Sequence, residues 1–209
     1  MKRSMISKFA VIGAATAAAV AMLPSAAHAA TTVAINYDAV GTTHMASTNN
    51  NIPLGPSTLS TVLDVDTFDL TGHLPLPKQH TTFTVLGFVP VEADVTFIEA
   101  APLTGHLDLA GVNAIVTSNA SYTVQLSNVK MGGLPGLVGS NCKTKSPITI
   151  SANTPAGEGF DILGGGNLAG TFTLGDFKNC GINTWLINQI VPGSGNTVSI
   201  TVSNGQVVG

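Results

Sequence analysis

The sequence predicts an antiparallel β-sandwich, with a β-barrel as the alternative, that carries one short helix near its C-terminus. Apolar residues recur with a period of two in many short segments, which is typical of strands that bury one face. Gly, Pro and Asn punctuate the chain between these segments, as turns do. Residues 183–191 instead place apolar residues at helical spacing, directly before Pro192 and Gly193. Many short strands joined by turns indicate a sandwich or a barrel.

The first 29 residues have the features of a secretory signal peptide. An apolar run over residues 9–23 follows three basic residues and precedes the small residues Ala27 and Ala29. The run is shorter than the roughly 20 residues that a membrane-spanning helix needs, so an uncleaved anchor is the weaker alternative. We therefore expect cleavage after Ala29, no transmembrane anchor, and one β-sandwich domain over residues 30–209 that is secreted and is extracellular or associated with the cell surface.

The charge of the mature chain argues against nucleic acid as a partner. The whole chain has 8 Lys and Arg and 11 Asp and Glu. The leader contains three of the basic residues and no acidic residue, which leaves five against 11, and the mature part has no arginine. A net negative chain without guanidinium groups repels polyanions and lacks their bidentate ligand.

Within the mature chain, alternating apolar and polar residues predict the first strands at residues 33–37 and 59–65. A seven-residue pattern, Leu-x-Gly-x-apolar-x-Leu, then occurs in three segments, at residues 70–76, 103–109 and 168–174. In a strand, the Leu, Gly and apolar positions share one face, and the position after Gly points to the other face. That position is His73, His106 or Thr171, so we expect the two histidines to face solvent, with a shared metal as the alternative. The glycine predicts a bulge or a close backbone approach.

Further strands are expected around residues 95–97 and 198–202, before and after the predicted helix. The helix contains Trp185, the single tryptophan, among Leu186, Ile187 and Ile190. These apolar neighbours predict that Trp185 packs in the core.

Metal-binding patterns are weak. Asp64, Asp66 and Asp69 superficially resemble a calcium loop, but their spacing is wrong and Phe68 stands where an oxygen ligand is wanted. A turn between two strands is the expected structure, with calcium as the alternative. His44 and His80 could complete a metal site with the other histidines only through tertiary contacts. We therefore expect no metal and no cofactor.

The two cysteines, Cys142 and Cys180, both lie in the exported part. Export to an oxidising compartment predicts that they form a structural disulfide, with a reactive thiol or a metal ligand as the alternative. In the chain-entropy model such a bond is worth roughly 4 kcal/mol.

Catalytic signatures are scarce. No Gly-x-Ser-x-Gly elbow is present. The glycine-rich residues 164–170 precede a strand rather than the helix that a dinucleotide site requires. Glu92, Asp94 and Glu99 resemble a glycosidase carboxylate pair. With a period of two, Glu92 and Asp94 share one face and Glu99 takes the other, so we expect solvent-face residues on a strand. We expect no catalytic residues and no enzymatic activity.

Four segments carry a family resemblance: "LGPSTLSTVLDVDT" (residues 54–67), "LGFVPVEADVTFIEAAPLTG" (86–105), "VQLSNVKMGGLP" (124–135) and "LINQIVPGSGNTVSITVSNG" (186–205). Behind a leader, they resemble a group of exported actinobacterial all-β proteins of unassigned function. The resemblance implies export and an all-β fold, but it implies no activity and no site residue.

Two functions follow as expectations. The first is a non-catalytic module of the cell envelope or extracellular matrix that binds protein or glycan partners. The alternative is an extracellular carrier of an apolar small molecule, which the apolar stretches at residues 85–90 and 132–139 suggest. A carrier needs a cavity of roughly 300 Å³ or more, lined by those stretches.

Overall fold

The structure of the protein is a computed structural model that describes residues 30–85, 87–109, 111 and 113–208. The predicted leader and its cleavage point after Ala29 lie outside the described residues.

The described residues form strands, a short 3-10 helix and one α-helix, in the following order: β1 (Thr32–Met45), β2 (Asn50–Asp64), β3 (Asp69–His73), β4 (Gln79–Val85), β5 (Val89–Asp108), β6 (Ile115–Met131), β7 (Leu134–Pro135), β8 (Cys142–Thr144), β9 (Ile148–Ser151), β10 (Gly165–Leu174), β11 (Phe177–Lys178), η1 (Gly181–Asn183), α1 (Thr184–Ile190) and β12 (Gly193–Val208). The prediction of an all-β chain with one short helix near the C-terminus is confirmed.

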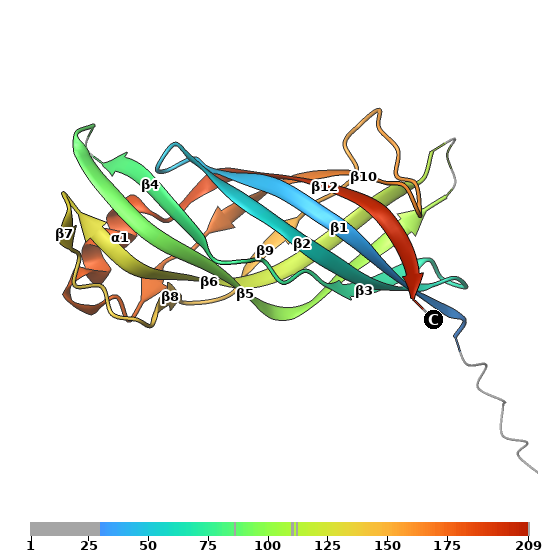
Figure 1. The fold of residues 1–209 in the computed structure, drawn as a ribbon, viewed down its shortest axis with the longest axis horizontal. Coiled ribbons are helices and arrows are strands. Elements are labelled where there is room, and N and C mark those ends of the chain that lie inside the picture. The colour runs from blue at the N-terminus through green and yellow to red at the C-terminus, as the bar shows by residue number, and fades with distance from the viewer. Residues whose placement is uncertain (1–29, 86, 110, 112, 209) are drawn as a thin grey trace, which may run out of the picture.

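All the strands belong to one antiparallel sheet, which is curled into an elongated half-barrel (Figure 1). Its main path runs β10-β12-β1-β2-β3-β5-β6-β8-β11, while β4 pairs with β5, and β7 and β9 pair with β6. The strands are therefore continuous around one curl rather than divided between two stacked sheets, which corresponds to the barrel-like alternative of the sequence prediction.

The curl brings β10, at one end of the path, beside β9. Asn153, which follows β9, forms an antiparallel bridge with Ala169 of β10. The Asn153 N–H donates to the Ala169 carbonyl at 2.9 Å, and the Ala169 N–H donates to the Asn153 carbonyl at 2.8 Å. This seam joins β10 to the strands that pair with β6.

The inside of the curl is a packed apolar core. On β5, Val91, Ala93, Val95 and Phe97 are buried in alternation with partly exposed residues, as expected for a strand with one solvated face. The cavities within this core measure about 40, 50 and 40 Å³. Each is far below the range of ligand pockets, so side chains fill the interior.

The three Leu-x-Gly segments behave as the pattern predicts. His73, His106 and Thr171 are exposed, while the leucines and other apolar positions are buried or half-buried, except Leu109, which is 44% exposed. A Cβ atom on the glycine would meet a carbonyl oxygen of the adjacent backbone in every copy: at 2.5 Å for Gly72, 2.6 Å for Gly105 and 1.6 Å for Gly170. The repeated glycine thus permits a close backbone approach. The position after it is exposed in all three segments, so the fold does not require a histidine there.

The α1 helix packs beside β11 at one end of the half-barrel (Figure 1). The Asn188 side chain accepts the Phe177 N–H at 2.7 Å and donates to the Phe177 carbonyl at 3.0 Å. Ile187 is buried, but Trp185 is 72% exposed, so the prediction that this tryptophan packs in the core is wrong. Residues two positions apart lie on different sides of a helix, and here the core needs only the Ile187 side.

Within the described ranges, no helix combines the length and the apolar character needed to cross a membrane.

Candidate functional site

The cysteines are joined as expected. Cys142 of β8 and Cys180, just before η1, form a disulfide with 4.3 Å between their Cα atoms. Both residues are fully buried. This bond connects the end of the sheet to the segment that leads into α1.

The histidines do not gather into one site. His73 contacts Glu99 at 3.1 Å, His106 contacts Asp69 at 2.9 Å, and His44 contacts Asn51 at 2.9 Å. These three histidines each have a different partner on the outer surface, so the tertiary contacts bring no two of them to a common ligand position.

The Asp64–Asp69 segment forms a turn between β2 and β3. The Asp64 carboxylate accepts the N–H groups of Asp66 and Thr67 at 2.8 and 3.1 Å, as in an Asx turn. Asp69 is directed to His106 instead, and this contact lowers the pKa of the Asp69 carboxyl. Across the described part of the chain, no three His, Cys, Asp or Glu side chains cluster in a way that could hold a metal ion.

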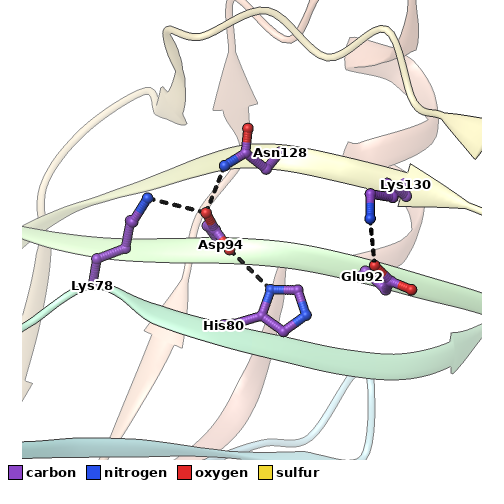
Figure 2. A network of polar contacts seen from close by, with 6 residues as sticks. All are labelled: Lys78, His80, Glu92, Asp94, Asn128 and Lys130. Carbon is purple, nitrogen blue, oxygen red and sulfur yellow. Dashed lines mark hydrogen bonds and ion pairs between the residues drawn. The ribbon is translucent and has the colours of Figure 1, made fainter.

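A polar network covers the outer face of β4, β5 and β6 (Figure 2). Its centre is Asp94 on β5, whose carboxylate accepts hydrogen bonds from Lys78 at 3.0 Å, His80 at 2.9 Å and Asn128 at 2.7 Å. The separate pair Lys130–Glu92, at 3.0 Å, lies next to it. Sequence periodicity correctly placed Glu92 and Asp94 on one face of the strand, but their partners on β6, on β4 and directly before β4 come from the tertiary pairing.

Asp94 is held in its ionised form. Hydrogen bonds from His80, Asn128 and Lys78 hold the pKa of this carboxyl well below its ordinary value of 3.8. A general acid or base works best with a pKa near the operating pH. The Asp94 carboxylate is therefore suited to a structural or electrostatic role, and unsuited to proton transfer near neutral pH.

We expect the Asp94→Asn variant to have a lower Tm than the wild-type protein at neutral pH. A depressed pKa in the folded state contributes stability above the unfolded value of about 3.8, and that contribution is lost as the pH falls through the folded pKa. Calorimetry from pH 7 downward should thus show the two melting curves converging below about pH 4. Asp176→Asn, which breaks an exposed pair with Lys145, is the control and should change the Tm little. A constant difference between Asp94→Asn and wild type down to pH 2 would contradict this role.

An open hollow of about 420 Å³ adjoins the network and is lined by His80, Asp94, Asn128, Val129, Lys130 and Pro135. A second open hollow, of about 690 Å³, lies around Phe160 and Asp161 at the other end of the half-barrel. In that second hollow, Asp161 is engaged by the N–H groups of Leu163 and Gly164, which lower the pKa of its carboxyl. In both hollows the carboxylates are thus engaged by neighbouring groups of the chain.

The end of the half-barrel that contains α1 exposes large apolar side chains. We define the apolar end as five residues that are each between 68% and 81% exposed: Phe88, Leu134, Leu137, Ile182 and Trp185. They come from the β4–β5 turn, β7, the segment before β8, η1 and α1, which Figure 1 shows at the same end. The sequence indicated the apolar character of residues 85–90 and 132–139, but it did not indicate that η1 and α1 join them.

Several contacts hold the segments of the apolar end together. The Asn183 side chain donates to the Gly136 carbonyl, which connects η1 to the segment after β7. The Gly132 N–H donates to the Pro90 carbonyl at 2.8 Å, which connects the β6–β7 turn to β5. With the disulfide, these contacts hold the exposed side chains on a constrained scaffold.

No protein-family model, curated protein or solved structure matches this chain.

Proposed function

We propose that this protein is an exported, non-catalytic binding module of the cell envelope or extracellular matrix, with protein or glycan partners, and that it makes contact through the apolar end. The observation that carries the proposal is the exposure of all five apolar-end side chains to solvent above a filled core. Large apolar side chains that stay exposed at one end of a molecule favour an interaction surface there, because leaving them in water has a free-energy cost that a partner can remove.

The interior supports surface binding rather than carriage of a small molecule. The core cavity that Phe83 and Val91 help to line, beside the β4–β5 turn, measures about 40 Å³, well below the roughly 300 Å³ at which ligand pockets begin. Phe88, Leu134 and Leu137 belong to the two stretches that suggested a carrier, and they point outward. The same residues therefore favour an external partner.

The arrangement of charged groups supports a non-catalytic role. Asp94 is kept ionised by three donors, Glu92 pairs with Lys130, and Glu99 contacts His73 and the Leu74 N–H. Each member of the carboxylate set that resembled a glycosidase pair is thus engaged in stabilising the strands. Export is supported by the leader-like residues 1–29 and by the disulfide, which is typical of oxidising compartments. Export and the all-β fold also agree with the resemblance to exported actinobacterial proteins.

The test is sedimentation of residues 30–209 with isolated cell envelopes of the producing organism. We expect the wild-type protein to bind and the Leu137→Ser/Ile182→Ser variant to bind at least about tenfold more weakly, since burial of one such side chain can contribute that factor. Leu163→Ser removes a half-exposed leucine at the other end and should bind like wild type. Treating the envelopes with protease or with a glycan hydrolase identifies the partner class. Absence of binding, or equal binding by both variants, would overturn the proposal.

A further inference from the structure

We infer that the apolar end docks on an anionic lipid surface, with the long axis of the half-barrel pointing away from the bilayer. The inference rests on the proposed function in one respect, namely that the apolar end is the contact surface. It adds the anionic bilayer as the surface on which this end docks, beside the protein or glycan partners of the envelope, and four features of this end suit a bilayer.

The first feature is shape. The five side chains project from separate short segments, and none of them lines the cavities or hollows described above. Gly87, Gly132 and Gly133 adopt positive φ in the turns beside Phe88 and Leu134, and no atom lies within 4 Å of a Cβ built on them. Apolar tips that project from turns with open space beside their glycines are suited to insertion between lipid headgroups.

The second feature is the distribution of lysines. All five lysines of the mature chain lie in the half of the molecule that contains α1. Lys78 and Lys130 pair with carboxylates near the start of β5, and Lys143, Lys145 and Lys178 lie on or beside β8 and β11, the strand that contacts α1. This half has three acidic residues, Glu92, Asp94 and Asp176, so five lysines against three carboxylates leave a net charge of +2. The remaining eight acidic residues lie along the rest of the half-barrel, which has no lysine. The electrostatic attraction to an anionic surface is thus confined to the end that exposes the apolar side chains.

Two of these lysines remain available for lipid phosphates. Lys78, Lys130 and Lys145 form ion pairs with Asp94, Glu92 and Asp176. Among the described residues, no carboxylate pairs with Lys143 or Lys178, and the Lys178 ammonium donates to the Lys145 carbonyl. Both residues lie on β8 and β11, next to the Cys142–Cys180 bond and the start of η1.

The third feature is length, which separates the acidic part from the surface. β5 contains 20 residues and runs from the apolar end to Asp108; at about 3.3 Å per residue it spans roughly 65 Å. The Debye length at physiological ionic strength is about 8 Å. When the molecule stands upright, the acidic far part is therefore screened from an anionic bilayer at the apolar end. Tilting would bring these carboxylates close to the bilayer, and the resulting repulsion favours the upright orientation.

The fourth feature is Trp185, whose side chain is 72% exposed at this end. Tryptophan favours the interface between headgroups and acyl chains, because its ring is apolar and its N–H is a donor. The disulfide and the Asn183–Gly136 hydrogen bond already order its segment, so little conformational entropy is lost on docking.

The experiment uses residues 30–209 and protein-free vesicles, either of phosphatidylcholine alone or of phosphatidylcholine mixed with phosphatidylglycerol. Because Trp185 is the single tryptophan, its fluorescence reports on the apolar end directly. We expect a blue shift and co-sedimentation with the anionic vesicles, both weakened by added salt. Phe88→Ser/Leu134→Ser should partition at least about tenfold more weakly, and Lys143→Glu should lose affinity for the anionic vesicles selectively. Leu163→Ser, at the other end, should bind as wild type does.

Three outcomes would overturn the lipid inference: no binding and an unshifted Trp185 spectrum with both vesicle types, equal binding by Phe88→Ser/Leu134→Ser and Leu163→Ser, or equal binding to neutral and anionic vesicles. The proposed function would fail separately. If the protein ignores vesicles but binds envelopes, and the apolar-end variant loses that binding, the contact surface stands and the lipid assignment is wrong. Near-UV circular dichroism of every variant confirms that the fold is retained.

Discussion

The Gly170→Ala variant should lose about 4 kcal/mol of the free energy of unfolding or fail to fold. A Cβ atom at this position would lie 1.6 Å from the carbonyl oxygen of Ser151 and 2.8 Å from its carbonyl carbon. Because backbone atoms form the obstruction, no side-chain rotation can relieve it. The β9 and β10 segments must separate, and the bridge between Asn153 and Ala169 would break with them. Guanidinium denaturation measures the loss of stability.

Gly175→Ala is the matched control, since it makes the same chemical change where nothing lies within 4 Å of the new Cβ. We expect that variant to be as stable as the wild-type protein or slightly more stable, because alanine restricts the unfolded chain. Hydrogen exchange adds a local readout, in which the Ala169 amide loses protection in Gly170→Ala alone if the variant folds. A Gly170→Ala protein within about 1 kcal/mol of wild type would show that the seam between β9 and β10 does not approach as closely as described.

Replacing both cysteines, in Cys142→Ala/Cys180→Ala, should lower the free energy of unfolding by about 4 kcal/mol. The bond closes a loop across 38 positions, and its loss increases the conformational entropy of the unfolded chain. Both positions are fully buried, so alanine avoids placing a new unsatisfied polar group in the core. Denaturation of the oxidised wild-type protein and of the variant, under identical conditions, measures the difference.

The same disulfide should affect docking as well as stability. It joins the segment that follows Leu137 to the segment that precedes Ile182, and so constrains both of these parts of the apolar end. A folded but reduced wild-type protein is therefore expected to bind vesicles more weakly than the oxidised protein, because docking then has to order these segments. Reduced protein with unchanged stability and unchanged binding would contradict both roles of the bond.

The sequence by itself determined the local features of this protein. A period of two placed the buried face of the strands that it identified, and Val95 and Phe97 lie inside as alternation requires. The Leu-x-Gly pattern, which occurs three times, separated the inward positions from His73 and His106. This works because successive side chains of a strand point to opposite faces. The two cysteines, together with the export that the leader-like residues predict, predicted the disulfide.

Only the tertiary structure decided which segments meet. Whether short strands divide into two stacked sheets or curl as one depends on long-range pairing, and alternation is the same in both cases. The partners of Asp94 come from β4, from the residue before it and from β6, up to 34 positions away in the sequence. Trp185 illustrates the limit most clearly: helical spacing identified its helix, but which side of a short helix faces the core is decided by packing. Here Ile187 is buried and Asn188 bonds to β11, while Trp185 stays exposed on a helix at the same end as the β4–β5 turn and β7.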